Sequence, residues 1–230
     1  MKTILITGTN RGLGLEFTRQ YLQEGQRVIA TARQPEAAAE LQALRESYPD
    51  TLTLQALDVT DPESREALSE AVGDRVIHLL INNAGYYGAS NELGKLDQDE
   101  WGKVFLINCI APIKMVELLR SNLVNAGSAT VALLSSKMGS IADNGSGGKY
   151  AYRSSKAALN AAAKSLAIDL ATEQIKVVAL HPGWVQTDMG GPNALIDAKT
   201  SITGMRKVIA GLKASQSGDF IGYDGTLIPW

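Results

Sequence analysis

Short strand-like runs alternate with longer helical patterns along the whole chain, and this alternation restricts the fold more than any other feature of the sequence. Runs such as residues 4–6 and 131–134 are apolar at consecutive positions, as in strands that are buried on both faces. Strands that alternate with helices pair in parallel through right-handed crossovers, so helices cover both faces of the sheet. The sequence therefore predicts an α/β, Rossmann-type fold, a doubly wound parallel sheet of about seven strands with helices on both faces.

The expected strands lie at 3–7, 27–31, 52–57, 77–82, 130–135 and 176–181, with a last one near Phe220. The helical patterns lie at 12–23, 36–47, 63–72, 98–125 and 152–171. No internal repeat or low-complexity linker divides the chain, so residues 1–230 are expected to form a single domain. Residues 189–205, which contain Pro192 and several small polar side chains, predict a mobile loop.

Composition and charge argue against several classes of protein. The net charge of −2 gives no reason to expect nucleic acid or a membrane surface as a partner, and no window approaches the ~20 apolar residues of a membrane span. The lone Cys109 cannot form an internal disulfide, which favours the cytoplasm as the compartment. With two histidines and one cysteine in the chain, no metal site is expected.

A glycine-rich turn between the first expected strand and the first helix predicts a phosphate-binding site. Its three glycines are spaced G-x3-G-x-G, within a stretch that reads TGTNRGLG. Such a turn lets backbone amides approach a pyrophosphate, and the positive end of the helix dipole adds to the attraction. A tight turn that binds no ligand is the alternative. The residues expected to bind a dinucleotide here are Gly8, Asn10, Arg11, Gly12, Leu13 and Gly14.

The residues at the end of the second strand favour NADP(H) over NAD(H). In dinucleotide sites an acidic residue about 20 residues after the glycines binds the adenosine ribose, but residues 29–33 contain no carboxylate. Arg33 lies there instead and Arg11 lies inside the glycine turn, and guanidinium groups bind a 2′-phosphate well. The alternative is that Arg33 is an exposed charge at the end of a strand. Asp58, after the third strand, is expected to lie beside the adenine ring or to cap the following turn.

Tyr152 and Lys156 stand four residues apart, and Ser136 precedes them at the end of an apolar run. Residues four apart share a face of a helix, so both side chains can point into one cleft. A phenol has a pKa near ~10, and a nearby ammonium, reinforced by the oxidised nicotinamide, lowers that pKa by stabilising the phenolate. We therefore expect Tyr152 to donate a proton to a carbonyl oxygen that Ser136 holds by a hydrogen bond. Tyr150 is a weaker rival because no cation follows it four residues on, and Ser135 points to the opposite side of the strand.

Taken together, the motifs of this chain and their order resemble those of the short-chain dehydrogenase/reductase superfamily, and the resemblance extends over nearly the whole chain. The resemblance rests on the glycine turn, Asp58-Val59, Asn82-Asn83-Ala84-Gly85, Asn108, Ser136, Tyr152 with Lys156, and Pro182-Gly183 followed by Thr187. It implies that the catalytic residues are Asn108, Ser136, Tyr152 and Lys156. Asn108 would hold a water that connects the lysine to solvent, unless it is simply a satisfied buried amide. The cofactor contacts implied beyond the glycine turn are those of Arg33, Asp58, Val59, Asn83, Ala84, Gly85, Tyr152, Lys156, Pro182, Gly183, Val185 and Thr187.

More narrowly, YAYRSSKAALN at 150–160, HPGWV at 181–185 and TDMGG at 187–191 resemble the C-factor and sniffer-like carbonyl reductases. The resemblance implies NADP(H)-dependent reduction of a small-molecule ketone or aldehyde to an alcohol by a single NAD(P)-binding domain. It also implies an alternative, a cofactor-bound signalling or regulatory protein of the C-factor type with little or no required turnover. Relatives often pair through the helix of the Tyr–Lys motif, which would give a homodimer or homotetramer, but the sequence leaves the oligomeric state open. The alanines of that helix suit packing on its own sheet equally well.

The segment between Ser136 and Tyr152 is rich in glycine and is predicted to be a flexible wall of the substrate cleft. Residues 189–205 are expected to lie on the same, substrate side. Six apolar side chains either line this cleft or pack in the core: Tyr86, Tyr87, Met138, Ile141, Trp184 and Met189.

Overall fold

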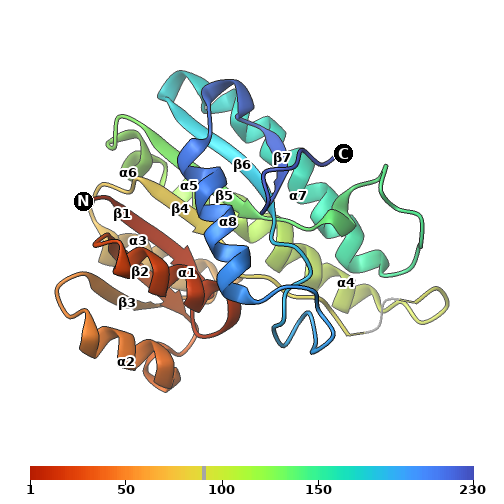
Figure 1. Ribbon diagram of the computed structural model, residues 1–230, viewed down its shortest axis with the longest axis horizontal. Coiled ribbons are helices and arrows are strands. Elements are labelled where there is room, and N and C mark those ends of the chain that lie inside the picture. The colour runs from red at the N-terminus through yellow and green to blue at the C-terminus, as the bar shows by residue number, and fades with distance from the viewer. Residues whose placement is uncertain (90–91) are drawn as a thin grey trace.

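The strands of the sheet are all parallel and follow the order β3-β2-β1-β4-β5-β6-β7 (Figure 1). The computed structural model describes residues 1–89 and 92–230. The strands are β1 (Thr3–Thr7), β2 (Arg27–Ala32), β3 (Leu52–Ala56), β4 (Leu79–Asn82), β5 (Ala129–Leu134), β6 (Ile175–His181) and β7 (Asp219–Gly222). The order reverses at β1, which lies between β2 and β4. The predicted doubly wound parallel sheet is therefore confirmed.

Helices cover both faces of the sheet, as predicted. One face carries α1 (Gly12–Gln23), α2 (Ala39–Ser47) and α8 (Ala198–Gly211), and α1 and α8 lie side by side in Figure 1. The other face carries α3 (Pro62–Val72), α5 (Ala111–Leu118), α6 (Arg120–Val124) and α7 (Tyr150–Asp169), with α4 (Gln98–Phe105) packed against α7. Within the described ranges, none of the helices combines the length and the apolar character that crossing a membrane requires.

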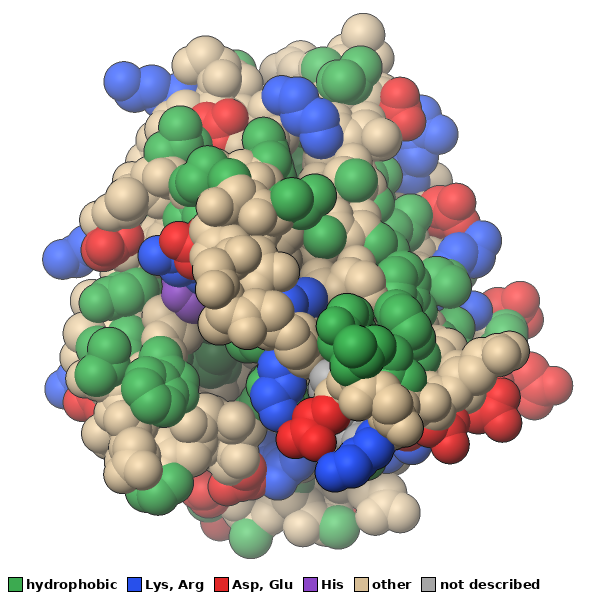
Figure 2. All heavy atoms as spheres, turned by 90° about the vertical axis from the view of Figure 1, so that its right-hand side faces the viewer, with side chains coloured by type: hydrophobic (Ala, Val, Ile, Leu, Met, Phe, Trp, Pro, Cys, Tyr) green, Lys and Arg blue, Asp and Glu red, His purple; other side chains and the backbone are tan. Residues whose placement is uncertain are grey.

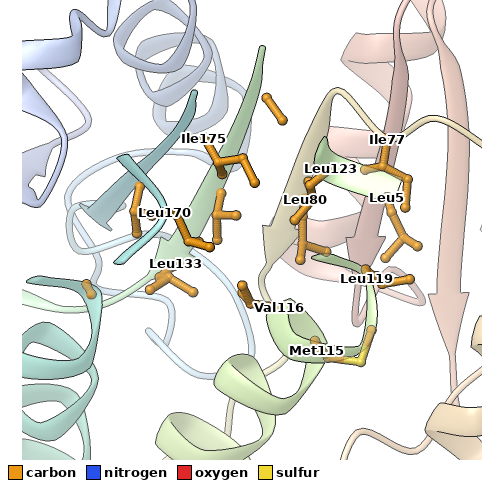
Figure 3. Close-up of a cluster of buried hydrophobic side chains, with 14 of the residues drawn as sticks. Leu5, Ile77, Leu80, Met115, Val116, Leu119, Leu123, Leu133, Leu170 and Ile175 are labelled. Atoms are coloured by element: carbon orange, nitrogen blue, oxygen red, sulfur yellow. The ribbon is translucent and has the colours of Figure 1, made fainter. Parts of the chain in front are cut away.

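Each face of the central strands contributes to its own hydrophobic cluster. In β1, Leu5 packs with the helices of one face, whereas Ile4 and Ile6 pack with the helices of the other. Figure 3 shows the first cluster, in which Leu5 and Leu80 from the strands lie near side chains from α5 and the residue that follows it. Full burial of one such side chain stabilises the fold by about 1.5–3 kcal/mol. Burial on both faces explains why these strands are apolar at consecutive positions.

The helical stretch expected at 98–125 is confirmed in its extent, but it is not one regular α-helix. After α4 ends at Phe105, residues Leu106–Ile110 form one π-helical turn, and α5 and α6 follow it. Asn108 lies in the middle of this turn and is fully buried. The wider π turn occurs mostly as a single turn inside longer helices and often at functional sites. A run of five residues is too short for hydrophobic periodicity to distinguish a π turn from an α-helix.

The loop expected at 189–205 is shorter in the structure, because α8 begins at Ala198. Asp197 caps this helix, with its Oδ1 accepting a hydrogen bond from the amide of Thr200 at 2.7 Å. The buried apolar residues of α8 are Ile202, Met205 and Ile209. Their helical spacing is a signal in the sequence, but small polar residues and glycines around it obscure the pattern. The mobility of the remaining irregular segment stays a prediction.

Candidate active site

The loops after β1 and β4 meet where the order of the sheet reverses, which is where open α/β sheets form their ligand-binding crevice. Thr7 joins these two loops, because its Oγ1 accepts hydrogen bonds from the amides of Asn83 and Ala84, each at 3.0 Å. The side-chain Nδ2 of Asn83 donates to the carbonyl oxygens of Thr7 at 2.8 Å and Gly8 at 2.9 Å. Asn83 therefore holds the glycine turn in place from the neighbouring loop.

The glycine turn fits the pyrophosphate of a dinucleotide. A Cβ on Gly14 would lie 2.1 Å from the carbonyl oxygen of Gly8. The start of α1 can therefore pack this closely on the turn only because residue 14 is a glycine. Arg11 is the N-cap residue of α1, and its side chain makes no capping hydrogen bond. The first amides of the helix are therefore available to an anion, which the helix dipole also attracts.

The two arginines expected at a 2′-phosphate differ in their partners. Arg11 forms an ion pair with Asp188, and both side chains are largely exposed. Arg33 is exposed at the end of β2 and forms no ion pair within the described ranges. The hydrogen bonds that Asp58 accepts from the amide and hydroxyl of Thr60, at 2.9 and 2.6 Å, hold the pKa of Asp58 below its usual value. Nearby Arg33 lowers that pKa further, so Asp58 both caps the turn after β3 and lies close to Arg33.

Ser135 and Ser136 point to opposite sides at the end of β5. The hydroxyl of Ser135 donates to Oδ1 of Asn160 at 2.5 Å, inside the core. The Oγ of Ser136 accepts a hydrogen bond from the amide of Met138 at 3.2 Å and is also hydrogen-bonded to the phenol of Tyr152. Of the two serines, Ser136 is the one that lies beside the tyrosine.

Tyr152 lies in the first turn of α7 and is 7% exposed. Burial raises the pKa of Tyr152 to about 12, and the hydrogen bond with Ser136 offsets part of that rise. In the protein itself, removing the phenolate from water therefore has a larger effect than the neighbouring ammonium. The lowering expected from the ammonium together with the oxidised nicotinamide stays a prediction. Tyr152 is a neutral hydrogen-bond donor at neutral pH. The rival Tyr150 is more exposed, at 36%, and is not hydrogen-bonded to Ser136.

Lys156 lies one turn further along α7 and is buried beside Tyr152. Its Nζ donates to the carbonyl oxygen of Leu134 at 2.7 Å and lies 5.8 Å from the centre of the Tyr152 ring. Burial lowers the pKa of Lys156 to about 8, so the ammonium is still the main form at neutral pH. A Cβ on Gly139 would lie 2.7 Å from the carbonyl carbon of Lys156. The absence of a side chain there lets the turn after Ser136 pack directly on the helix.

Asn108 links the loop after β4 to the first turn of α7. Its Oδ1 accepts a hydrogen bond from the amide of Tyr86, and its Nδ2 donates to the carbonyl oxygen of Tyr86, both at 2.8 Å. Nδ2 also donates to the hydroxyl of Ser155 at 3.0 Å, and that hydroxyl donates to the backbone oxygen of Tyr152 at 2.8 Å. Both N–H groups of the amide are engaged, so a water bound by Asn108 would have to donate to one of its oxygens.

The segment after β6 forms the opposite wall of the crevice. Val185 forms a bridge with Ile196, and the hydroxyl of Ser201 on α8 donates to the carbonyl oxygen of Pro182 at 2.6 Å. The methyl carbon of Thr187 lies 3.7 Å from the position that a Cβ would take on Gly12, so this segment reaches the glycine turn. The other predicted cofactor residues on loops at the carboxyl ends of strands are Val59, Gly85 and Gly183.

His181, at the end of β6, supports the turn that follows Ser136. Its Nδ1 accepts a hydrogen bond from the amide of Lys137 at 3.2 Å. Burial lowers the pKa of His181 to about 4, with a further lowering by the charge of Lys137, so the imidazole is neutral and can accept. In the sequence, His181 stands out only as a possible metal ligand and as part of the HPGWV stretch, because residue type and spacing alone do not reveal a supporting hydrogen bond.

Thr7, Arg153 and Ser155 are the other supporting residues that sequence reasoning missed. Arg153 ties the glycine-rich loop to α7, because its guanidinium donates to the carbonyl oxygen of Met138 at 3.2 Å and to the hydroxyl of Ser146 at 2.8 Å. The loop expected to be a flexible wall is therefore anchored to α7 through Arg153.

The apolar side chains predicted to line the cleft all lie outside the buried core. Ile141, Trp184 and Met189 are 79%, 51% and 51% exposed, and Tyr86, Tyr87 and Met138 are half-buried. The ring of Tyr87 packs against that of Tyr152, with ring centres 4.7 Å apart. Figure 2 shows the side of the molecule to which these loops extend, with hydrophobic side chains on both sides of a hollow. A separate groove of about 820 Å³, between α8 and the residues after β7, contains none of these side chains.

Known proteins resemble this chain in sequence and in structure. The family model described as short chain dehydrogenase matches residues 2–195. The C-signal of Myxococcus xanthus is 46% identical over 154 residues, which cover 67% of this chain and 93% of that protein. The carbonyl reductase Sniffer of D. melanogaster superposes with a TM-score of 0.95 at 35% identity, over 100% of both chains. The NADPH-bound carbonyl reductase from chicken fatty liver superposes with a TM-score of 0.94 at 34% identity, over 100% of this chain and 99% of that one.

Proposed function

The chain belongs to the short-chain dehydrogenase family of oxidoreductases, and from that premise we propose that it is an NADP(H)-dependent carbonyl reductase that converts a ketone or aldehyde into an alcohol. The observation that carries the proposal is the buried contact between Tyr152 and Ser136 beside the ammonium of Lys156. These groups supply a proton, a second hydrogen bond and a positive charge at one point of the cleft. The reduced nicotinamide, when bound, supplies the hydride for the carbonyl carbon.

In this proposal Ser136 and Tyr152 act on the same carbonyl oxygen. Their hydroxyls hydrogen-bond that oxygen, which orients the carbonyl and stabilises the negative charge that develops on it. Tyr152 then transfers its proton to the oxygen, so the phenol O–H bond breaks as the alcohol O–H bond forms. The ammonium of Lys156, 5.8 Å from the ring centre, stabilises the resulting phenolate. The raised pKa of Tyr152 keeps the phenol protonated at neutral pH, as a proton donor for reduction requires.

The proposed cofactor site is the glycine turn for the pyrophosphate, Lys156 for the nicotinamide ribose, and Arg33 with Arg11 for a 2′-phosphate. Two observations support NADP(H) over NAD(H). The residues that end β2 include no acidic side chain. The chicken carbonyl reductase that is 34% identical was crystallised with NADPH. Arg33 is free of ion pairs within the described ranges and can bind the 2′-phosphate directly, whereas Arg11 would first have to break its ion pair with Asp188. We also propose that the protein is cytoplasmic and pairs through α7.

Replacing Tyr152 with phenylalanine tests the proposal. Tyr152→Phe should lower kcat for carbonyl reduction by about 10²–10⁴-fold, because it removes the proton donor and leaves the ring. Its affinity for NADPH, measured by fluorescence titration, should stay close to that of the wild type. Tyr150→Phe is the matched control on the same helix and should retain activity. Full activity in Tyr152→Phe would remove this residue from the mechanism.

The 46% identity with C-signal supports a second candidate function, that of a cofactor-bound signalling protein. A protein that signals without turnover would keep its output in Tyr152→Phe and lose it when the glycine turn can no longer bind the nucleotide. A signalling assay on Tyr152→Phe separates the two candidates. Loss of output in that variant would count against a role based on binding alone.

A further inference from the structure

The residue before the catalytic helix has a backbone conformation that its type disfavours. Gly147, Gly148 and Lys149 have φ angles of 64°, 63° and 53°, so three successive residues are left-handed. Glycine adopts this region freely, but the Cβ of a lysine is crowded there. In the described ranges, Gln174 is the other non-glycine residue with a positive φ. A third glycine would suit this turn better than lysine, so the Lys149 side chain is a candidate for a function of its own.

The side chain of Lys149 reaches the aromatic pair at the site. Its Nζ lies 5.9 Å from the centre of the Tyr87 ring, and that ring packs against Tyr152 with 4.7 Å between the ring centres. The ammonium and the proton donor therefore lie near the same aromatic ring. A molecule whose carbonyl is held by Tyr152 and Ser136 has this cation within reach on the side of Tyr87.

The neighbouring cations already have partners within the protein. Lys137 pairs with Asp143 at 3.1 Å, and Arg153 donates to the carbonyl oxygen of Met138 at 3.2 Å. Lys149 is exposed and forms no ion pair with any residue in the described ranges. A cation held over an aromatic ring and lacking a carboxylate partner is suited to bind an anionic group from solution.

We propose that Lys149 recognises an anionic group of the substrate, so the substrate is a carbonyl compound that carries a carboxylate on an apolar or aromatic body. The body packs on Tyr87, the carboxylate pairs with Lys149, and the carbonyl reaches Tyr152 and Ser136. The inference rests on the proposed reductase function and adds the class of substrate to it. Because Lys149 contacts a part of the substrate that does not react, its contribution is to binding and should appear in KM rather than in kcat.

Two aldehydes with the same ring test the inference: 4-carboxybenzaldehyde, which is an anion at neutral pH, and its neutral methyl ester, methyl 4-formylbenzoate. The measured quantity is the ratio of their kcat/KM values with NADPH. Lys149→Gly keeps the left-handed turn and removes the ammonium, and it should lower the preference for the acid about two- to fivefold, through KM. Lys149→Arg should restore the preference. Lys164→Gln, an exposed lysine on α7 away from the site, is the matched control and should leave the ratio at its wild-type value.

Salt provides a second readout, because screening weakens the attraction between exposed charges. Raising the NaCl concentration should increase the wild-type KM for the acid more than that for the ester, and Lys149→Gly should lose this difference. An unchanged ratio in Lys149→Gly, while the wild type reduces both aldehydes, would overturn the inference and leave the reductase function intact. If the wild type binds NADPH but reduces neither aldehyde nor simple neutral ketones, the proposed function fails and this inference fails with it.

Discussion

At the glycine turn the protein presents backbone amides that neighbouring loops hold in place, whereas at the substrate end it presents side chains on exposed loops. Asn83 and Thr7 fix the turn with four hydrogen bonds of 2.8–3.0 Å. At the other end Ile141, Trp184 and Met189 are more than half exposed. A site built from backbone groups requires glycine at fixed spacing, so it leaves a strong pattern in the sequence. A site built from exposed side chains tolerates many residue types and leaves a weak one.

The largest expected effect contrasts one glycine at each end. In Gly14→Ala the new Cβ would lie 2.1 Å from the carbonyl oxygen of Gly8, so the turn must shift. The free energy of unfolding should fall by about 3 kcal/mol or more, and NADPH binding should be lost. A Cβ on Gly145, in the glycine-rich loop, has no neighbour within 4 Å, so Gly145→Ala should change stability by about 0.5 kcal/mol or less. Urea unfolding and NADPH titration measure both, and equal effects of the two substitutions would refute the contrast.

His181 differs from the exposed side chains of the substrate end, because it is partly buried and holds the segment after Ser136 by a hydrogen bond. Its pKa is 6.5 without the protein environment and about 4 in the fold. Below pH 6.5 the unfolded chain therefore takes up the proton first, and the folded state loses up to about 3 kcal/mol of stability as the pH falls to 4. His181→Asn keeps an acceptor for the amide of Lys137 but does not titrate, so its stability should depend less on pH over this range.

Urea unfolding at a series of pH values measures this dependence. His78→Asn is the control, because His78 is less buried than His181 and lies at the other end of the sheet. A wild-type pH dependence that persists in His181→Asn would assign the acid sensitivity to other groups.

The smallest effect concerns the two exposed arginines on which the cofactor end is proposed to depend. Arg33→Ala should weaken NADPH binding about tenfold, or about 1.4 kcal/mol, and leave NADH binding nearly unchanged, because NADH lacks the 2′-phosphate. Arg11→Ala should have a smaller effect, since Arg11 is paired with Asp188 before the cofactor binds. Fluorescence titration at fixed ionic strength measures both affinities. Equal losses of affinity for NADPH and NADH would mean that Arg33 does not bind the 2′-phosphate.

The sequence was sufficient for features that depend on local pattern. Consecutive apolar residues predicted the strands of a parallel sheet, and the four-residue spacing of Tyr152 and Lys156 placed both on one side of a helix. The same reasoning failed where the conformation depends on only a few residues, or where a property depends on the surroundings in the folded protein. The π turn around Asn108 has no periodic signal, and α8 was missed because polar residues dilute its apolar face. The rise that burial causes in the pKa of Tyr152 was not foreseen, because burial cannot be judged from the sequence.

The sequence by itself determined the alternation of strands and helices along the chain and the glycine turn between the first two of them, since both follow from residue type and spacing, and it proposed the set of reacting side chains. The tertiary structure decided which groups support them. Asn83 holds the glycine turn, His181 holds the segment after Ser136, and Lys149 lies over the ring of Tyr87. The two partners in each of these contacts are far apart in the sequence, and the position of Lys149 also depends on an unusual backbone angle. Hydrogen bonds and burial depend on distances in three dimensions, and those distances exist only once the chain has folded.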